Sequence, residues 1–116
     1  MTCGPGIENR RFTKGWTLTM AEKIRDERTD FLFRAVLSLD NLEECYHFFE
    51  DICTISEIQE MAKRLTAAKM LNENYIYTEI AEQTGLSTAT ISRVNRALKY
   101  GNDGYTTVLD RIGKRK

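Results

Sequence analysis

The sequence has little proline, few cysteines and no long apolar run. Pro5 is the one proline among 116 residues, so no rigid breaker of helices follows it. The three cysteines, Cys3, Cys45 and Cys53, are odd in number and lack the close paired spacing of zinc sites, which predicts neither a disulfide framework nor a bound metal. No apolar run exceeds three residues, which predicts neither a secretory leader nor a membrane span. We therefore expect a soluble, cytoplasmic, helical protein.

Charge is unevenly distributed along the chain. The formal net charge is zero, yet residues 30–60 carry one arginine against eight carboxylates, a net charge of −7. Residues 61–116 carry ten Lys or Arg against five carboxylates, a net charge of +5. A surface that binds phosphate needs only a local excess of positive charge. The C-terminal half is therefore the candidate nucleic-acid-binding region.

The length is that of one domain with one modest core. Residues 1–22 mix glycines, Pro5 and a lone Trp16 without periodicity, which predicts a disordered tail. Helical patterning begins just after Met20, so either Met1 or Met20 is the natural start. We predict one helical domain over residues 23–113 and a short basic tail at 114–116.

The first half of the predicted domain contains two apolar segments. From Phe31 to Leu39 seven of nine residues are apolar, and a helix that is apolar on nearly all sides must be buried on nearly all sides. In so small a domain, this suggests burial against a second subunit. Asp40 or Asn41 is positioned to cap the next helix. Its apolar residues, at three- and four-residue spacing, are Leu42, Cys45, Phe48, Phe49 and Ile52.

A longer helix is predicted to follow, capped by Thr54 or Ser56, with Glu57 at capping-box spacing from Thr54. It should end near residues 72–74. Its predicted buried stripe consists of Ile55, Ile58, Ala62, Leu65 and Ala68. Further on, Gly101 is placed to end another helix in the left-handed conformation. The last segment has helical spacing at Tyr105, Val108, Leu109 and Ile112, although the β-branched residues 106–108 are also compatible with a strand.

Residues 78–99 have the pattern of a helix-turn-helix. Ala81 is small where two crossing helices approach, Gly85 can adopt the positive φ of the tight turn, and Ser87 is a good N-cap for the second helix. The residues expected to form the small core are Ile80, Leu86, Ile91, Val94 and Leu98.

The opposite face of the second helix is polar and contains no carboxylate. It gathers Thr88, Ala89, Ser92, Arg93, Arg96 and Lys99. Small residues at the start of such a helix let its backbone approach base edges, and arginine can bond guanine with two hydrogen bonds. The alternative is a merely solvated face, but such faces normally mix charges of both signs. We therefore predict that this face binds double-stranded DNA.

The segment Ala89-Thr-Ile-Ser-Arg93, preceded by Glu79-Ile-Ala-Glu-Gln-Thr-Gly85, resembles the helix-turn-helix of the Trp repressor family. The resemblance extends from about Asp30 to Ile112 and is closest to the small bacterial Trp-repressor-like proteins. It implies an all-α fold of six helices and an intertwined homodimer that binds a pseudo-palindromic operator. The residues implied by the resemblance and those chosen from the motif itself together form the predicted DNA-binding set. Its members are Thr78, Ser87, Thr88, Ala89, Thr90, Ser92, Arg93, Arg96 and Lys99.

The resemblance also implies an effector site. Arg64 and Arg93 match the two arginines that hold tryptophan in the Trp repressor, and Thr54 matches a backbone region there. However, Val94 replaces the small glycine that leaves room for the indole, and Ala97 replaces the serine that meets the ligand's amine. We therefore expect no response to tryptophan, while an unknown small-molecule effector stays open. Alternatively, Arg64 pairs with carboxylates of residues 30–60, and Arg93 contacts phosphate.

These observations predict a sequence-specific transcriptional regulator, a repressor, and not an enzyme. No nucleophile–base signature or phosphate-binding glycine loop occurs, and no cofactor is expected. His47 stands beside an aromatic pair and is interpreted as a packing residue. The alternative function is a helix-turn-helix that serves only as a protein-interaction module.

Overall fold

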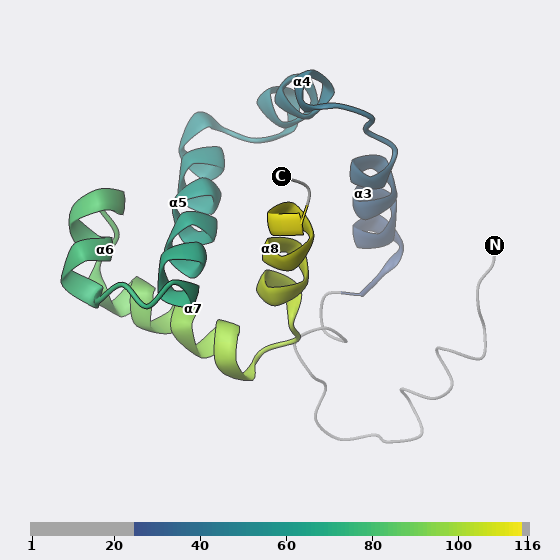
Figure 1. Ribbon diagram of the computed structural model, residues 1–116. Coiled ribbons are helices and arrows are strands. Elements are labelled where there is room, and N and C mark those ends of the chain that lie inside the picture. The colour runs from purple at the N-terminus through teal and green to yellow at the C-terminus, as the bar shows by residue number, and fades with distance from the viewer. Residues whose placement is uncertain (1–24, 115–116) are drawn as a thin grey trace. The chain divides into compact units, whose positions relative to one another are not determined.

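The described part of the chain is helical throughout. The computed structural model describes residues 25–114, and within that range it contains six helices and no strand (Figure 1). Their bounds are α3 Glu27–Leu37, α4 Leu42–Ile52, α5 Ile55–Asn72, α6 Tyr77–Thr84, α7 Thr88–Tyr100 and α8 Gly104–Lys114. The predicted all-α class is confirmed, and the strand left open for residues 106–108 is wrong because they belong to α8. The predicted tail at residues 1–22 lies outside the described residues.

The chain divides into two compact units between Tyr46 and His47, within α4. The first unit contains α3, whose N-cap is Asp26. The Asp26 carboxylate accepts a 2.8 Å hydrogen bond from the backbone N–H of Thr29, and this bond lowers the pKa of Asp26. The predicted single domain over residues 23–113 stays a prediction.

The apolar residues of α3 are accessible in the single chain. No residue of this helix is buried, and Phe31 and Leu37 are 77% and 82% exposed. The described residues of one chain therefore do not bury this helix. Its burial against a second subunit stays a prediction.

The next two helices begin at side-chain caps. The Asn41 side-chain oxygen accepts a 2.9 Å hydrogen bond from the backbone N–H of Glu44, so Asn41 rather than Asp40 caps α4. Thr54 Oγ1 accepts from the backbone N–H of Glu57 at 3.1 Å, and a Glu57 carboxylate oxygen accepts from the Thr54 N–H at 2.8 Å. These two reciprocal bonds confirm the predicted capping box.

The second unit continues with α5, which ends at Asn72 as predicted. Asn74 follows with a left-handed φ of 70°. Its N–H donates to the Leu71 carbonyl, and the Tyr75 N–H donates to the Met70 carbonyl, both at 3.0 Å. This is the Schellman pattern, which satisfies the last carbonyls of a helix and turns the chain toward the next one.

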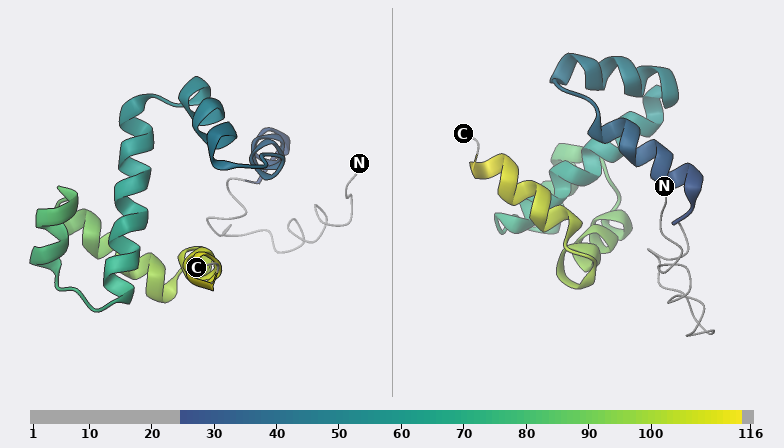
Figure 2. Two further views of the ribbon diagram at one scale, coloured as in Figure 1. Left: turned by 45° about the horizontal axis from the view of Figure 1, so that its top comes forward. Right: turned by 90° about the vertical axis from the view of Figure 1, so that its right-hand side faces the viewer.

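The core of the second unit lies where the C-terminal half of α5 meets α6 and α7. Figures 1 and 2 show α6 and α8 on opposite sides of α5, with α7 passing from one to the other, and α8 contacts both α5 and α7. The buried apolar residues are Ala67, Ala68, Met70, Ile80, Leu86, Ile91 and Val94.

The predicted buried stripe of α5 is largely wrong. Only Ala68 of its five members is buried, whereas Ile55 is 73% exposed and Leu65 is 36% exposed. The reason is tertiary, because the packed core contacts α5 near its C-terminal end, at Ala67, Ala68, Met70 and the partly buried Leu71. Helical periodicity identifies an apolar face but does not indicate how much of its length a neighbour covers.

Gly101 ends α7, but not in the predicted left-handed conformation. Its φ of −86° and ψ of −146° lie outside that region. A Cβ atom at this position would stand 2.5 Å from the carbonyl oxygen of Ala97. A glycine is therefore required here, because the backbone at position 101 passes close to the Ala97 carbonyl one turn earlier in α7. The left-handed residue of this turn is Asp103, with a φ of 64°.

Candidate nucleic-acid interface

The first helix of the motif, α6, is short and packs on the core through Ile80 and the partly buried Tyr77 and Ala81. Ile80 is fully buried in the core of the second unit. At the start of the helix, the backbone N–H of Ile76 donates to a carboxylate oxygen of Glu79 at 3.2 Å. Thr78, a predicted DNA-binding residue in the first turn, is exposed. The start of α6 thus presents Thr78 while Ile80 holds the helix against its neighbours.

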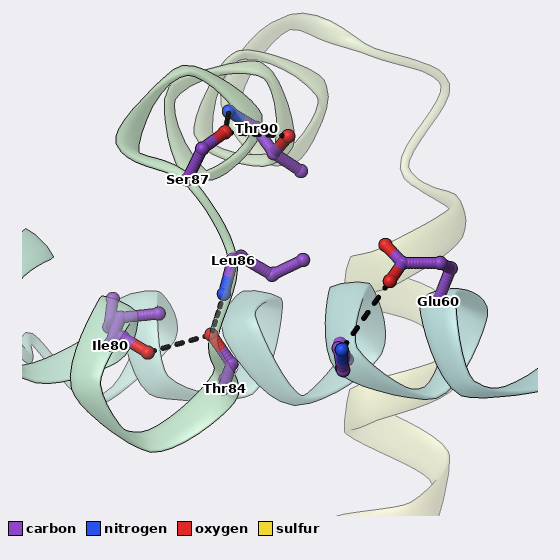
Figure 3. Close-up of polar contacts among 7 residues, drawn as sticks. Glu60, Ile80, Thr84, Leu86, Ser87 and Thr90 are labelled. Carbon is purple, nitrogen blue, oxygen red and sulfur yellow. Dashed lines mark hydrogen bonds and ion pairs between the residues drawn. The ribbon is translucent and has the colours of Figure 1, made fainter. Parts of the chain in front are cut away.

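The turn between α6 and α7 combines the predicted glycine with a buried threonine. Gly85 has a φ of 78°, which confirms its predicted left-handed role. Thr84 Oγ1 donates to the Ile80 carbonyl at 2.7 Å and accepts from the Leu86 N–H at 3.2 Å (Figure 3). One buried hydroxyl therefore links the end of α6 to the chain that enters α7.

Ser87 begins the second helix of the motif, as predicted. Its Oγ accepts a hydrogen bond from the Thr90 backbone N–H at 3.1 Å and lies 3.1 Å from Thr90 Oγ1, close enough for a second bond (Figure 3). Thr90 is only half-exposed. Both residues belong to the predicted DNA-binding set, and in this structure both hydroxyls serve the start of α7.

Four of the five predicted motif core residues are buried. Ile91 is fully buried, Val94 is 3% exposed, and Ile80 and Leu86 complete the group. Leu98 is only half-buried. Because Ile91 and Val94 face the core of the second unit, the opposite side of α7 faces solvent.

The exposed side of α7 carries the rest of the predicted set. Thr88, Ala89, Ser92, Arg93, Arg96 and Lys99 are all exposed. One further residue, Tyr100, is 83% exposed at the last position of the helix. Sequence reasoning omitted it because a tyrosine at a helix end has no distinctive spacing. The predicted face is therefore continuous along the helix and open to solvent.

The electrostatics of this face are of one sign. α7 contains no Asp or Glu, and its cations are Arg93, Arg96 and Lys99. Among residues 25–114, these three cations form no ion pair and no hydrogen bond through their side chains. The nearest carboxylates before them in the sequence belong to Glu79 and Glu82 of α6. An unneutralised cationic face of this kind attracts phosphate.

The three predicted effector residues occupy different places. Thr54 caps α5, and both its hydroxyl oxygen and its N–H are engaged with Glu57. Arg64 is half-buried ten residues further along the same helix, a rise of about 15 Å. Arg93 lies on the exposed side of α7. Within the second unit, no ion pair joins Arg64 to a carboxylate of the described residues, and the alternative pairing with residues 30–60 stays a prediction.

An open apolar hollow lies between α5, α7 and α8. It has a volume of about 550 Å³ and is lined by Leu65, Ala97, Asn102, Gly104, Tyr105 and Val108. Thr54, Arg64 and Arg93 are not among its lining residues. Within the described range, no three His, Cys, Asp or Glu side chains lie where they could jointly bind a metal ion. None of the described helices is long and apolar enough to span a bilayer.

Comparison with known proteins places these features in context. A sequence model described as Trp repressor protein matches residues 27–113. The chain is 56% identical over 91 residues to the uncharacterized protein YerC of Bacillus subtilis, covering 78% of this chain and 88% of YerC.

Two solved structures are similar in both sequence and fold. A TrpR-like protein from Eubacterium eligens shares 56% identity with a TM-score of 0.76, covering 78% of this chain and 94% of the other. A protein from Staphylococcus aureus described as a candidate Trp repressor shares 51% identity with a TM-score of 0.79, covering 83% and 96%. The residues matched by the sequence model, 27–113, extend from the start of α3 into α8 and include both helices of the motif.

Proposed function

Because this chain belongs to the Trp repressor family, we propose that it is a cytoplasmic transcriptional repressor that binds a pseudo-palindromic DNA operator as a homodimer. The observation that carries the proposal is the exposed face of α7, which has small residues at its start, no carboxylate, and three cations that form no ion pair within residues 25–114. Small residues allow close approach to base edges, and cations neutralise phosphate.

The proposed dimer rests on the apolar residues that one chain leaves exposed. They include Phe31 and Leu37 of α3, Leu42 of α4, Ile55 of α5 and Ile112 of α8. So many large apolar side chains in contact with water are typical of an interface. In a dimer of this class, the two copies of α7 would enter successive major grooves about 34 Å apart.

Tryptophan is not the proposed effector. Val94 stands where the Trp repressor has the glycine that admits the indole of tryptophan. Val94 is 3% exposed and packed in the core. Ala97 has no hydroxyl to meet the ligand's amine. Opening this packed site for a flat ring would require repacking that costs about 1–3 kcal/mol. Added tryptophan should therefore leave DNA affinity unchanged, whereas an increase would contradict this part of the proposal.

A salt titration tests the DNA-binding proposal. The full chain is titrated into fluorescent duplexes of random sequence, and anisotropy is followed as ionic strength increases. We expect binding that weakens steeply with salt, and a shallower dependence for Lys99→Ala because one phosphate contact per subunit is lost. Lys69→Ala, which removes an exposed cation of α5, is the matched control and should keep the wild-type slope. Absent or salt-independent binding would refute the proposal and favour a protein-interaction module.

A further inference from the structure

The three cations of α7, Arg93, Arg96 and Lys99, project at different angles around the helix, and this indicates different roles. We propose that Arg96 reads a guanine in each half-site, while Arg93 and Lys99 contact phosphates on opposite walls of the same major groove. This inference rests on the proposed DNA-binding function. It goes further by naming the base that the site recognises and the side chain that determines the choice.

The side chains of Arg93, Arg96 and Lys99 leave α7 in different directions. At about 100° per residue, Ile91, Val94 and Leu98 define the inward side of α7, and Arg96 lies nearly opposite their centre. Arg93 and Lys99 lie about 60° to either side of Arg96. Since α5, α6 and α8 all contact α7, the inward side is occupied and Arg96 points away from the protein.

The width of α7 fits the major groove of DNA. A helix with its side chains is about 10–12 Å wide, and the major groove is about 12 Å wide. A side chain opposite the core therefore faces the base edges at the floor of the groove. Side chains about 60° to either side face the two walls, which consist of phosphates. Arg93 and Lys99 also differ by about 9 Å along the helix axis, so they reach separate phosphates.

Among the side chains on the outer side of α7, that of Arg96 has the length and the donors to reach a base. Near Arg96 on the central line are Ala89 and Ser92, which are too short to reach bases unless the backbone lies close. Arg96 is long enough to reach from the third turn, and its exposed guanidinium has no partner among residues 25–114. A planar guanidinium donates two parallel hydrogen bonds to O6 and N7 of guanine, a pattern that no other base offers in the major groove.

The test measures base preference separately from charge. A duplex enriched by the wild-type protein from a random-sequence pool is varied one base pair at a time, and affinity is measured for each variant protein. We expect Arg96→Ala to lose a preference of about 5- to 150-fold for one G·C pair in each half-site, and Arg96→Lys to keep only part of it because lysine lacks the planar fork. Arg96→Lys should keep the wild-type salt slope because it keeps the charge.

Arg93→Ala and Lys99→Ala should instead weaken binding to all duplexes by the same factor and lower the salt slope. The inference is overturned if the Arg96 variants keep the wild-type base preferences, or if Arg93→Ala or Lys99→Ala abolishes the preference for a G·C pair. Failure of the wild-type protein to bind any duplex would overturn the proposed function itself. Retention of DNA binding with an unchanged G·C preference in the Arg96 variants would overturn only the assignment of Arg96.

Discussion

Gly101 sets the end of the proposed recognition helix through a steric constraint. A methyl group there would lie 2.5 Å from the Ala97 carbonyl oxygen, so Gly101→Ala must displace the backbone. We expect a loss of about 1–3 kcal/mol in the free energy of unfolding, measured by urea titration. Gly113→Ala is the control, because a Cβ at Gly113 of α8 meets no atom within 4 Å. Equal stability of the two variants would contradict this explanation of Gly101.

Thr84 is the residue in the motif that sequence reasoning missed. Its hydroxyl bridges the Ile80 carbonyl and the Leu86 N–H in a buried position. A threonine can bond to the carbonyl four residues before it in any helix, so the sequence offers no signal that this one also satisfies a turn. Gly85 was predictable because a tight turn between helices requires a positive φ, which is a local requirement.

The elements and the motif core followed from local patterns, whereas the buried part of α5 did not. The caps Asn41, Thr54 and Ser87 and the C-terminal end of α5 are determined by residues within a few positions, and the structure confirms them. The buried part of α5 depends on which segment the later helices cover, which is not a local property. The predicted DNA-binding roles of Ser87 and Thr90 stay predictions, although their hydroxyls are engaged in capping.

The start of α7 allows helix stability to be separated from DNA binding. Ser87→Asp should keep the free energy of unfolding within about 0.5 kcal/mol, because aspartate is also a strong N-cap. The same change places a carboxylate at the exposed end of a face that has none, so DNA affinity should decrease through repulsion of phosphate. Chemical denaturation and DNA anisotropy on one sample check both quantities.

Ser87→Asn is the matched control, since it keeps an N-cap without adding charge. It should retain stability and most of the DNA affinity. If Ser87→Asp and Ser87→Asn bound DNA equally well, the start of α7 would not lie near phosphate, which would contradict the proposed orientation of the helix.

At the scale of the whole molecule, the proposed homodimer would cover the apolar residues that one chain leaves exposed. Sedimentation should give twice the chain mass of 13.4 kDa at micromolar concentration. Leu37→Lys should shift the mass toward one chain, because an 82% exposed side chain has space in the monomer but a lysine would be buried unpaired in an interface. Leu37→Met keeps an apolar contact and should remain dimeric. A wild-type protein that sediments as a single chain would contradict the dimer.

The central claim is that two copies of α7 read a symmetric DNA sequence, and selection from a pool of random duplexes tests it most directly. The wild-type full chain should enrich a sequence with two inverted half-sites whose centres lie about 10 base pairs apart, or one helical turn. Enrichment of an asymmetric sequence would contradict the dimeric mode of binding. No enrichment over the starting pool would contradict sequence-specific recognition altogether.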